Sequence, residues 1–139
     1  MSEPFPVTIY HNQDCGTSRN VLAMIRAAGY EPKVVEYLQV GWTRELLESL
    51  MAAMSARPRD LLRDKGTPAA ELGLLDPAVS DERILAAMLE HPILVNRPIV
   101  VTPKGTALAR PSEKVFALLE RVPESFTKED GEVVHPTAG

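Results

Sequence analysis

The sequence predicts an α/β fold in which a small mixed sheet of about four strands carries an inserted helical subdomain. Three observations support this fold class. A strand–helix–strand unit lies near the N-terminus, the middle of the chain has helical spacing, and a strand–turn–strand–helix unit follows. With 139 residues the chain is long enough to bury a real core, so we expect one domain over residues 1–139.

The N-terminal unit begins with a β-rich segment at residues 7–10. Residues 18–28 then place apolar side chains at helical spacing, and Gly29 ends that helix. A second strand is predicted at residues 33–38. Because a crossover helix joins parallel strands, the two strands are expected to run in the same direction.

The middle of the chain, at about residues 39–90, is predicted to be a helical insertion. The apolar spacing indicates helices at residues 43–54 and 59–63, and a third that ends near residue 90. Ser80 is a suitable N-cap for this third helix, because acidic residues follow it in the first turn.

Strand character returns at residues 98–102 and, after a turn rich in Pro and Gly, at residues 106–109. A last helix is predicted from about residue 111 to residue 119. This order of elements is that of the thioredoxin fold with an inserted helical part. The polar segment at about residues 123–139 is expected to be a flexible tail.

Composition and charge exclude several classes of function. A net charge of −4 argues against sequence-independent binding to nucleic acid or to an anionic membrane. No segment has the length of a membrane span, and no secretory signal is recognised, so we expect a cytoplasmic protein. One cysteine excludes an intramolecular disulfide. One cysteine and three scattered histidines predict neither a metal site nor a bound cofactor.

The single cysteine, Cys15, lies where a strand gives way to a helix. Either Thr17 or Ser18 can serve as the N-cap of that helix. A thiol at this place faces unpaired backbone N–H groups and the positive end of the helix dipole, so its pKa should fall. The same N–H groups attract oxyanions. The alternative is a small buried apolar side chain, but the polar neighbours of Cys15 disfavour it.

Three segments, in this order, carry a resemblance to a known family. They are Tyr10-His11-Asn12 followed by Cys15-Gly16-Thr17-Ser18-Arg19-Asn20, then His91-Pro92-Ile93-Leu94-Val95-Asn96-Arg97-Pro98-Ile99-Val100-Val101-Thr102-Pro103, and then Arg110-Pro111-Ser112-Glu113. They resemble the signatures of the glutathione/glutaredoxin-dependent bacterial arsenate reductases, and the similarity extends over about residues 7–132. One departure is Gln13, which replaces the proline common in that loop. A lost proline leaves the loop backbone less restrained.

The resemblance implies a reaction and its main residues. Cys15 matches the nucleophile that attacks arsenate and forms a thiol–arsenate adduct. Arg63, Arg97 and Arg110 match the three arginines that hold the oxyanion, and guanidinium groups suit this use because they present paired donors. Each arginine taken alone could be an ordinary surface or helix-end charge. The resemblance also implies a cis peptide bond before Pro98, which shapes the site.

Four residues near the thiol are secondary candidates. His11 could lower the pKa of Cys15, or it could cap the strand end or face solvent. Ser18 could donate a hydrogen bond to the thiolate or cap the helix. Asn12 and Thr17 are expected to shape the anion site.

A single thiol requires an external source of two electrons. The resemblance implies glutathione as co-substrate and glutaredoxin as the protein that resolves the mixed disulfide. One alternative is a redox-related transcription regulator of the same fold that binds RNA polymerase without turnover. Such regulators typically carry Cys-x-x-Cys, and Ser18 occupies the second position here. Another is a family member that reduces a different substrate or transfers thiols in general.

Overall fold

The structure, a computed structural model, describes residues 5–136, and the chain divides into two compact units. The first unit combines the chain up to Glu36 with the chain from Arg97 onward, and the second unit spans Tyr37–Asn96. The expected helical insertion, at about residues 39–90, lies within the second unit.

The first unit is built on a four-stranded mixed sheet, which confirms the predicted fold class. Its strands are β1 (Thr8–His11), β2 (Lys33–Glu36), β3 (Ile99–Thr102) and β4 (Gly105–Leu108), and their order in the sheet is β2-β1-β3-β4. β1 is parallel to β2, as the crossover helix predicts, and antiparallel to β3, which is antiparallel to β4.

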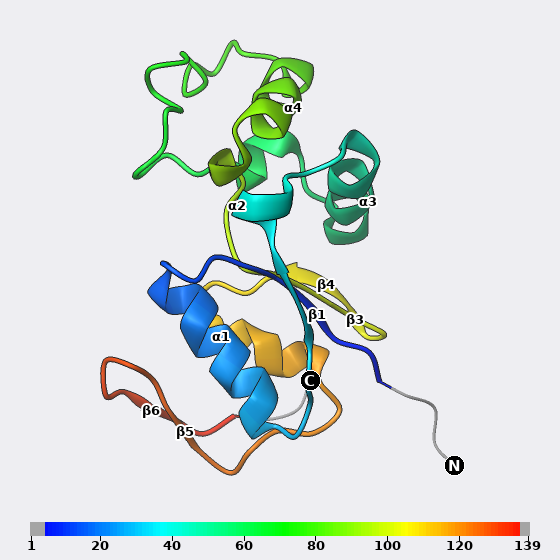
Figure 1. The fold of residues 1–139 in the computed structure, drawn as a ribbon, viewed down its shortest axis with the longest axis vertical. Coiled ribbons are helices and arrows are strands. Elements are labelled where there is room, and N and C mark those ends of the chain that lie inside the picture. Colours follow the sequence, from blue (N-terminus) through cyan, green and yellow to red (C-terminus); the bar gives the residue numbers. More distant parts are fainter. Residues whose placement is uncertain (1–4, 137–139) are drawn as a thin grey trace. The chain divides into compact units, whose positions relative to one another are not determined.

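Two helical elements pack against this sheet, side by side in Figure 1: α1 (Gly16–Ala27) and the 3-10 helix η3 (Ser112–Leu118). α1 buries the face that the apolar spacing predicted. The shared core draws on the sheet, on α1 and on η3, and its most fully buried members include Ile9, Val21, Met24, Ile25, Val100, Val115 and Leu119. Burial of this apolar area is the main favourable term in the folding of the unit.

The C-terminal part of the first unit contains a short hairpin. β5 (Phe126–Thr127) pairs antiparallel with β6 (Val133–Val134), which are red-orange in Figure 1. The hairpin lies inside the segment expected to be a flexible tail, residues 123–139, so part of that segment has regular structure. Residues 137–139 lie outside the described residues.

The second unit is helical. Its elements are α2 (Tyr37–Val40), α3 (Arg44–Met54), the 3-10 helix η1 (Pro58–Leu61), α4 (Asp81–Glu90) and the 3-10 helix η2 (Pro92–Leu94). The strand predicted at residues 33–38 is too long, because the chain leaves the sheet after Glu36. Tyr37 is fully buried within the second unit, where its ring stacks on that of Trp42 with centroids 5.0 Å apart. The chain therefore leaves β2 and begins α2 at Tyr37.

Hydroxyl side chains cap both long helices of the second unit. The Oγ1 atom of Thr43 accepts a hydrogen bond from the N–H of Leu46 at 3.1 Å, at the start of α3. Ser80 accepts from the N–H of Arg83 at 3.1 Å, at the start of α4, which confirms its predicted role. Each cap satisfies a backbone donor that the helix itself leaves unpaired.

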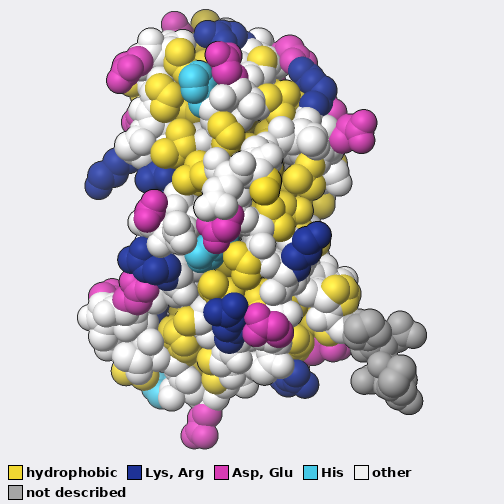
Figure 2. Space-filling model, in the orientation of Figure 1, with side chains coloured by type: hydrophobic (Ala, Val, Ile, Leu, Met, Phe, Trp, Pro, Cys, Tyr) yellow, Lys and Arg dark blue, Asp and Glu magenta, His cyan; other side chains and the backbone are white. Residues whose placement is uncertain are grey.

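The surface carries charges of both signs. On the face shown in Figure 2, acidic and basic side chains are interspersed, in line with the modest net charge of −4. Of the helices in the described part of the chain, none combines the length and the apolar character that crossing a membrane demands.

Candidate active site

Three sequence-predicted residues meet at one edge of the sheet. Cys15 follows β1, Arg97 precedes β3, and Arg110 follows β4. Because β3 is antiparallel to β1 and β4 is antiparallel to β3, the end of β1, the start of β3 and the end of β4 share an edge. The sheet topology therefore brings together residues that are far apart in the sequence.

Cys15 is itself the N-cap of α1, so the prediction of Thr17 or Ser18 as the cap is wrong. Cys15 has an extended backbone (φ −104°, ψ 120°), the helix begins at Gly16, and the Sγ atom accepts the N–H of Ser18 at 3.5 Å. Sulfur takes the place that a hydroxyl or carboxylate oxygen usually takes. The nucleophile thus receives a backbone donor at the positive end of the helix dipole.

The loop before Cys15 is held by its own hydrogen bonds. The N–H of Cys15 donates to the carbonyl of Asn12 at 3.0 Å, and the N–H of Asp14 donates to the Oδ1 atom of Asn12 at 2.9 Å. The N–H of Asn12 donates to the Oγ atom of Ser18 at 3.4 Å. Asn12 and Ser18 are both buried. These bonds restrain a loop in which Gln13 stands where proline is common.

The surroundings of Cys15 lower the pKa of its thiol. Burial acts in the opposite direction, since only 5% of the residue is exposed and burial disfavours the thiolate. The hydrogen bonds from the N–H and hydroxyl of Ser18, the positive charge of Arg97 and the N–H of Thr17 outweigh burial and hold the pKa of Cys15 below its usual value. The thiolate is therefore favoured by the donors of Ser18 and Thr17 and by the positive charge of Arg97.

Arg110 is the cation in direct contact with the thiol. Its Nη1 atom lies 3.9 Å from the Sγ atom of Cys15 and donates to the carbonyl oxygen of Arg97 at 3.1 Å. The Arg97–Pro98 peptide bond is cis, as the resemblance implied, and the Arg110–Pro111 bond is cis as well. Both arginines are half-buried beside one sulfur atom, an arrangement suited to a tetrahedral oxyanion.

Arg63, the third predicted arginine, belongs to the second unit. The helix predicted at residues 59–63 is η1, which ends at Leu61, so Arg63 does not lie in the last turn of a helix. Its N–H donates to the carbonyl of Leu94 at 2.8 Å, and its carbonyl accepts from the hydroxyl of Thr67 at 2.7 Å. These bonds hold its backbone within that unit. Its contribution to oxyanion binding stays a prediction.

His11 ends β1 with a buried side chain that pairs with Glu36. The Nδ1 atom lies 2.7 Å from the Oε2 atom of Glu36, and 5% of the His11 side chain is exposed. A solvent-facing His11, one of the alternatives from the sequence, is therefore wrong. Its Nε2 atom is buried and has no hydrogen-bond partner among residues 5–136. Sequence reasoning missed Glu36, although the parallel register of β1 and β2 places it directly beside His11.

A groove of about 620 Å³ runs along the exposed face of α1 and borders the loop that carries Cys15. His11 and Gln13 line it at the loop, and Arg19, Leu22, Ala23, Arg26 and Ala27 line it along the helix. The groove gives a small molecule room beside the loop.

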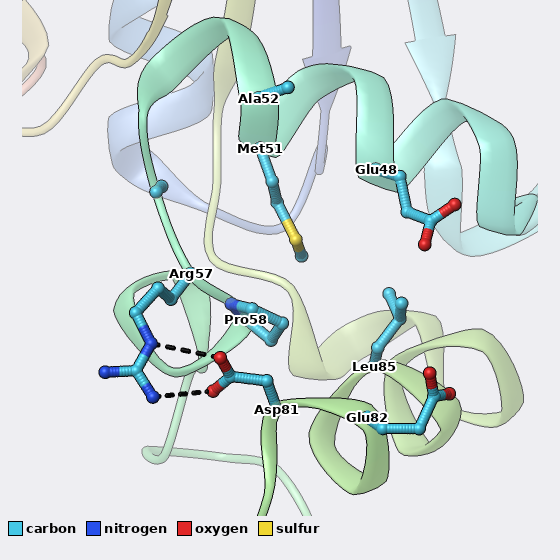
Figure 3. Close-up of a pocket in the computed structure, with 9 residues that line it drawn as sticks. Glu48, Met51, Ala52, Arg57, Pro58, Asp81, Glu82 and Leu85 are labelled. Atoms are coloured by element: carbon cyan, nitrogen blue, oxygen red, sulfur yellow. Dashed lines mark hydrogen bonds and ion pairs between the residues drawn. The ribbon is translucent and has the colours of Figure 1, made fainter.

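A second pocket, of about 390 Å³, lies within the second unit between α3 and α4 (Figure 3). Met51 and Leu85 line it, together with the carboxylates of Glu48, Asp81 and Glu82. The basic residue among its lining, Arg57, directs its guanidinium at the carboxylate of Asp81 through two hydrogen bonds of 3.0 Å. The pocket is therefore poorly suited to an oxyanion. Among residues 5–136, no group of three His, Cys, Asp or Glu side chains is placed to hold a metal ion.

Comparisons with known proteins show which family the chain resembles. The ArsC family matches residues 10–118. The chain is 59% identical over 134 residues to an arsenate reductase of Rhizobium meliloti, covering 96% of both chains, and 58% identical over 129 residues to one of Synechocystis, covering 92% of both. It is 52% identical over 134 residues to an arsenate reductase of Escherichia coli, covering 96% of this chain and 95% of that one.

Solved structures also include an arsenate reductase with a similar fold. An arsenate reductase from Vibrio cholerae superposes with a TM-score of 0.79 at 37% identity, covering 84% of this chain and all of that one. The family match at residues 10–118 includes Cys15, Arg97 and Arg110. The chain therefore belongs to the ArsC family.

Proposed function

We propose that the protein is an arsenate reductase, an oxidoreductase that converts arsenate to arsenite with glutathione and glutaredoxin as reductants. The observation that carries the proposal is a cysteine with a lowered pKa at a helix N-terminus, with the guanidinium of Arg110 at 3.9 Å from its sulfur. The relatives at 52–59% identity, which are named arsenate reductases, support the same activity.

In the first step the Cys15 thiolate attacks arsenic. A bond forms between Sγ and As(V), an As–O bond breaks, and the departing oxygen leaves as water after taking up protons. Arg97 and Arg110 bind the arsenate oxygens and stabilise their charge as the adduct forms. Arg63 is proposed as the third arginine of this set, from the second unit.

The electrons come from two external thiols, because Cys15 is the only cysteine in the chain. Glutathione displaces a second oxygen as water and forms an S–As(V) bond. A glutaredoxin thiolate then attacks the glutathione sulfur, the S–As bond breaks, and its electron pair reduces arsenic to As(III). Water releases arsenite and restores the Cys15 thiol. The groove along α1 supports this scheme, since it borders the Cys15 loop. A reducing cytoplasm, the expected location, supplies such thiols.

A regulator that binds RNA polymerase without turnover is the alternative from the sequence. The single cysteine argues against a disulfide switch, since such regulators typically carry Cys-x-x-Cys and the buried position 18 is a serine here, although it does not argue against a redox-silent binding protein. The guanidinium groups of Arg97 and Arg110 near the one thiol instead favour chemistry on an oxyanion.

The test is arsenate-dependent oxidation of NADPH in the presence of glutathione, glutaredoxin and glutathione reductase, with wild type and Cys15→Ser compared. Turnover that disappears in Cys15→Ser would establish both the reaction and the nucleophile. A folded wild-type protein without turnover would contradict the proposed function.

A further inference from the structure

The turn that joins β5 to β6 is a compact structure with a fixed shape. The N–H of Lys128 donates to the carbonyl of Glu132 at 2.8 Å, and the N–H of Gly131 donates to the carbonyl of Lys128 at 2.9 Å. The N–H of Glu132 also donates to the side chain of Asp130 at 2.9 Å. Gly131 has a φ of +93°, which other residues adopt only at a cost. Neighbouring residues of this turn are therefore held at fixed positions.

Glu129, in this turn, holds the start of α1. Its two carboxylate oxygens accept hydrogen bonds from the Nε and Nη2 atoms of Arg19 at 2.8 and 3.1 Å, and its N–H donates to the Oδ1 atom of Asn20 at 3.0 Å. The remaining Nη1 atom of Arg19 donates to the carbonyl of Gln13 at 2.8 Å. Glu129 thus fixes the guanidinium that restrains the backbone two residues before Cys15.

Lys128, the adjacent residue, holds a different segment. Its Nζ atom lies 2.8 Å from the Oε1 atom of Glu113, and its side chain is only 11% exposed. The same Glu113 oxygen accepts a hydrogen bond from the hydroxyl of Ser112 at 3.0 Å. Glu113 lies just past the cis Arg110–Pro111 bond, at the start of η3. Lys128 thus restrains the segment that carries Arg110.

We propose that Lys128 and Glu129 are positioning residues of the reaction, which hold the Arg110 segment and the Cys15 loop at a fixed spacing. The inference rests on the proposed attack of Cys15 on arsenate. Ion pairs as exposed as Arg19–Glu129 add little to stability, so their value here lies in geometry. Misplacing reacting groups by about 1 Å can cost on the order of 100-fold in rate.

The test compares Lys128→Met and Glu129→Gln with two matched controls, Lys114→Met and Glu124→Gln. Both control residues are exposed and lie in the same unit. Two measurements need no turnover: the rate at which iodoacetamide alkylates Cys15, and the arsenate concentration that half-protects Cys15 from this alkylation in the absence of glutathione. Melting temperatures show that each variant is folded, and Lys128→Arg, which keeps the ion pair, should behave as wild type.

The two variants should change different quantities. Lys128→Met should raise the half-protecting arsenate concentration and the KM for arsenate by about threefold to tenfold, with an unchanged alkylation rate of the free protein. Glu129→Gln should slow alkylation at pH 7, because the loop that holds the Sγ atom of Cys15 against the Ser18 donors of α1 loosens. Loss of the negative charge of Glu129 alone would speed alkylation, so a slower reaction reports the loop rather than the charge.

Equal changes of both quantities in both variants would show general destabilisation and would overturn the inference, as would wild-type behaviour of both variants. Failure of arsenate to protect the wild-type thiol would contradict the proposed function instead. In that case the alkylation rate of Glu129→Gln would still decide whether Glu129 positions the Cys15 loop.

Discussion

Cys15 becomes reactive through donors that its own helix supplies. Sulfur occupies the N-cap position, so the N–H of Ser18 meets it directly, and the hydroxyl of the same residue adds a second hydrogen bond. Ser18 also accepts from Asn12, so one fully buried side chain serves both the thiol and the loop that presents it. This double use explains why a serine, rather than a second cysteine, suits position 18.

Removal of the Ser18 hydroxyl should therefore raise the pKa of Cys15. Ser18→Ala is expected to slow the alkylation of Cys15 by iodoacetamide at pH 7 by about twofold to tenfold, because less thiolate is present. Alkylation rates measured from pH 5 to pH 10 check this, with the exposed Ser49→Ala as control. An unchanged pH profile would contradict a role for the Ser18 hydroxyl at the thiol.

Arg110 is expected to act on the oxyanion more than on stability. Arg110→Ala removes the guanidinium 3.9 Å from the sulfur and should lower kcat/KM for arsenate on the order of 100-fold. Steady-state kinetics with arsenate check this, with Arg83→Ala on the surface of α4 as the matched loss of one positive charge. A fall in melting temperature that accounts for the loss of activity would refute the assignment.

At the scale of single elements, regular patterns were predictable and local contacts were not. The sequence predicts α1, α3 and α4 because their apolar spacing repeats over several turns. It misses β5 and β6, which are two residues long each and show no alternating pattern. It extends β2 too far, because the burial of Tyr37 against Trp42 overrides the β preference of that segment.

The caps of the second unit provide a test of element stability. Thr43→Ala and Ser80→Ala should each lower the free energy of unfolding by about 1 kcal/mol, because each leaves an N–H group of a helix start without its partner. Urea denaturation followed by circular dichroism measures this. Thr43→Ser and Ser80→Thr, which keep a hydroxyl, should recover most of the loss, and a loss equal to that of the alanine variants would rule out capping as the cause.

At the scale of the whole molecule, the sequence predicted the fold class from the order of its elements, but not that β1 and β3 are neighbours. β1 lies between β2 and β3, and no spacing rule shows that β3 returns to β1 after the whole second unit. Of the candidate site, the strand-to-helix context predicts Cys15, and the resemblance implies Arg97 and Arg110. The contacts of Glu36, Lys128 and Glu129 could not be predicted, because a single charged residue shows no sequence pattern and their partners are distant in sequence.

The lowered pKa of Cys15 links the thiol to the stability of the fold. The folded-state pKa lies below the unfolded-state value of about 8.5, so the stabilisation is fully present above that value and is lost as the pH falls through the folded-state pKa. The free energy of unfolding of wild type relative to Cys15→Ala should therefore increase from pH 6 to pH 9.5. Denaturant titrations at several pH values under reducing conditions check this. A pH-independent difference would mean that the thiolate gains nothing from the fold.

The discontinuous first unit also affects how the protein is made. Thr8 pairs with Val101, so the central strand β1 has only one of its two neighbours until the ribosome has synthesised the complete second unit. Pairing across such a long separation is slow, and an unpaired strand edge invites association with other chains. The nascent chain therefore carries Cys15 for most of its synthesis without Arg97 and Arg110. Anion binding beside the thiol by these two arginines becomes possible only after β3 and β4 have emerged.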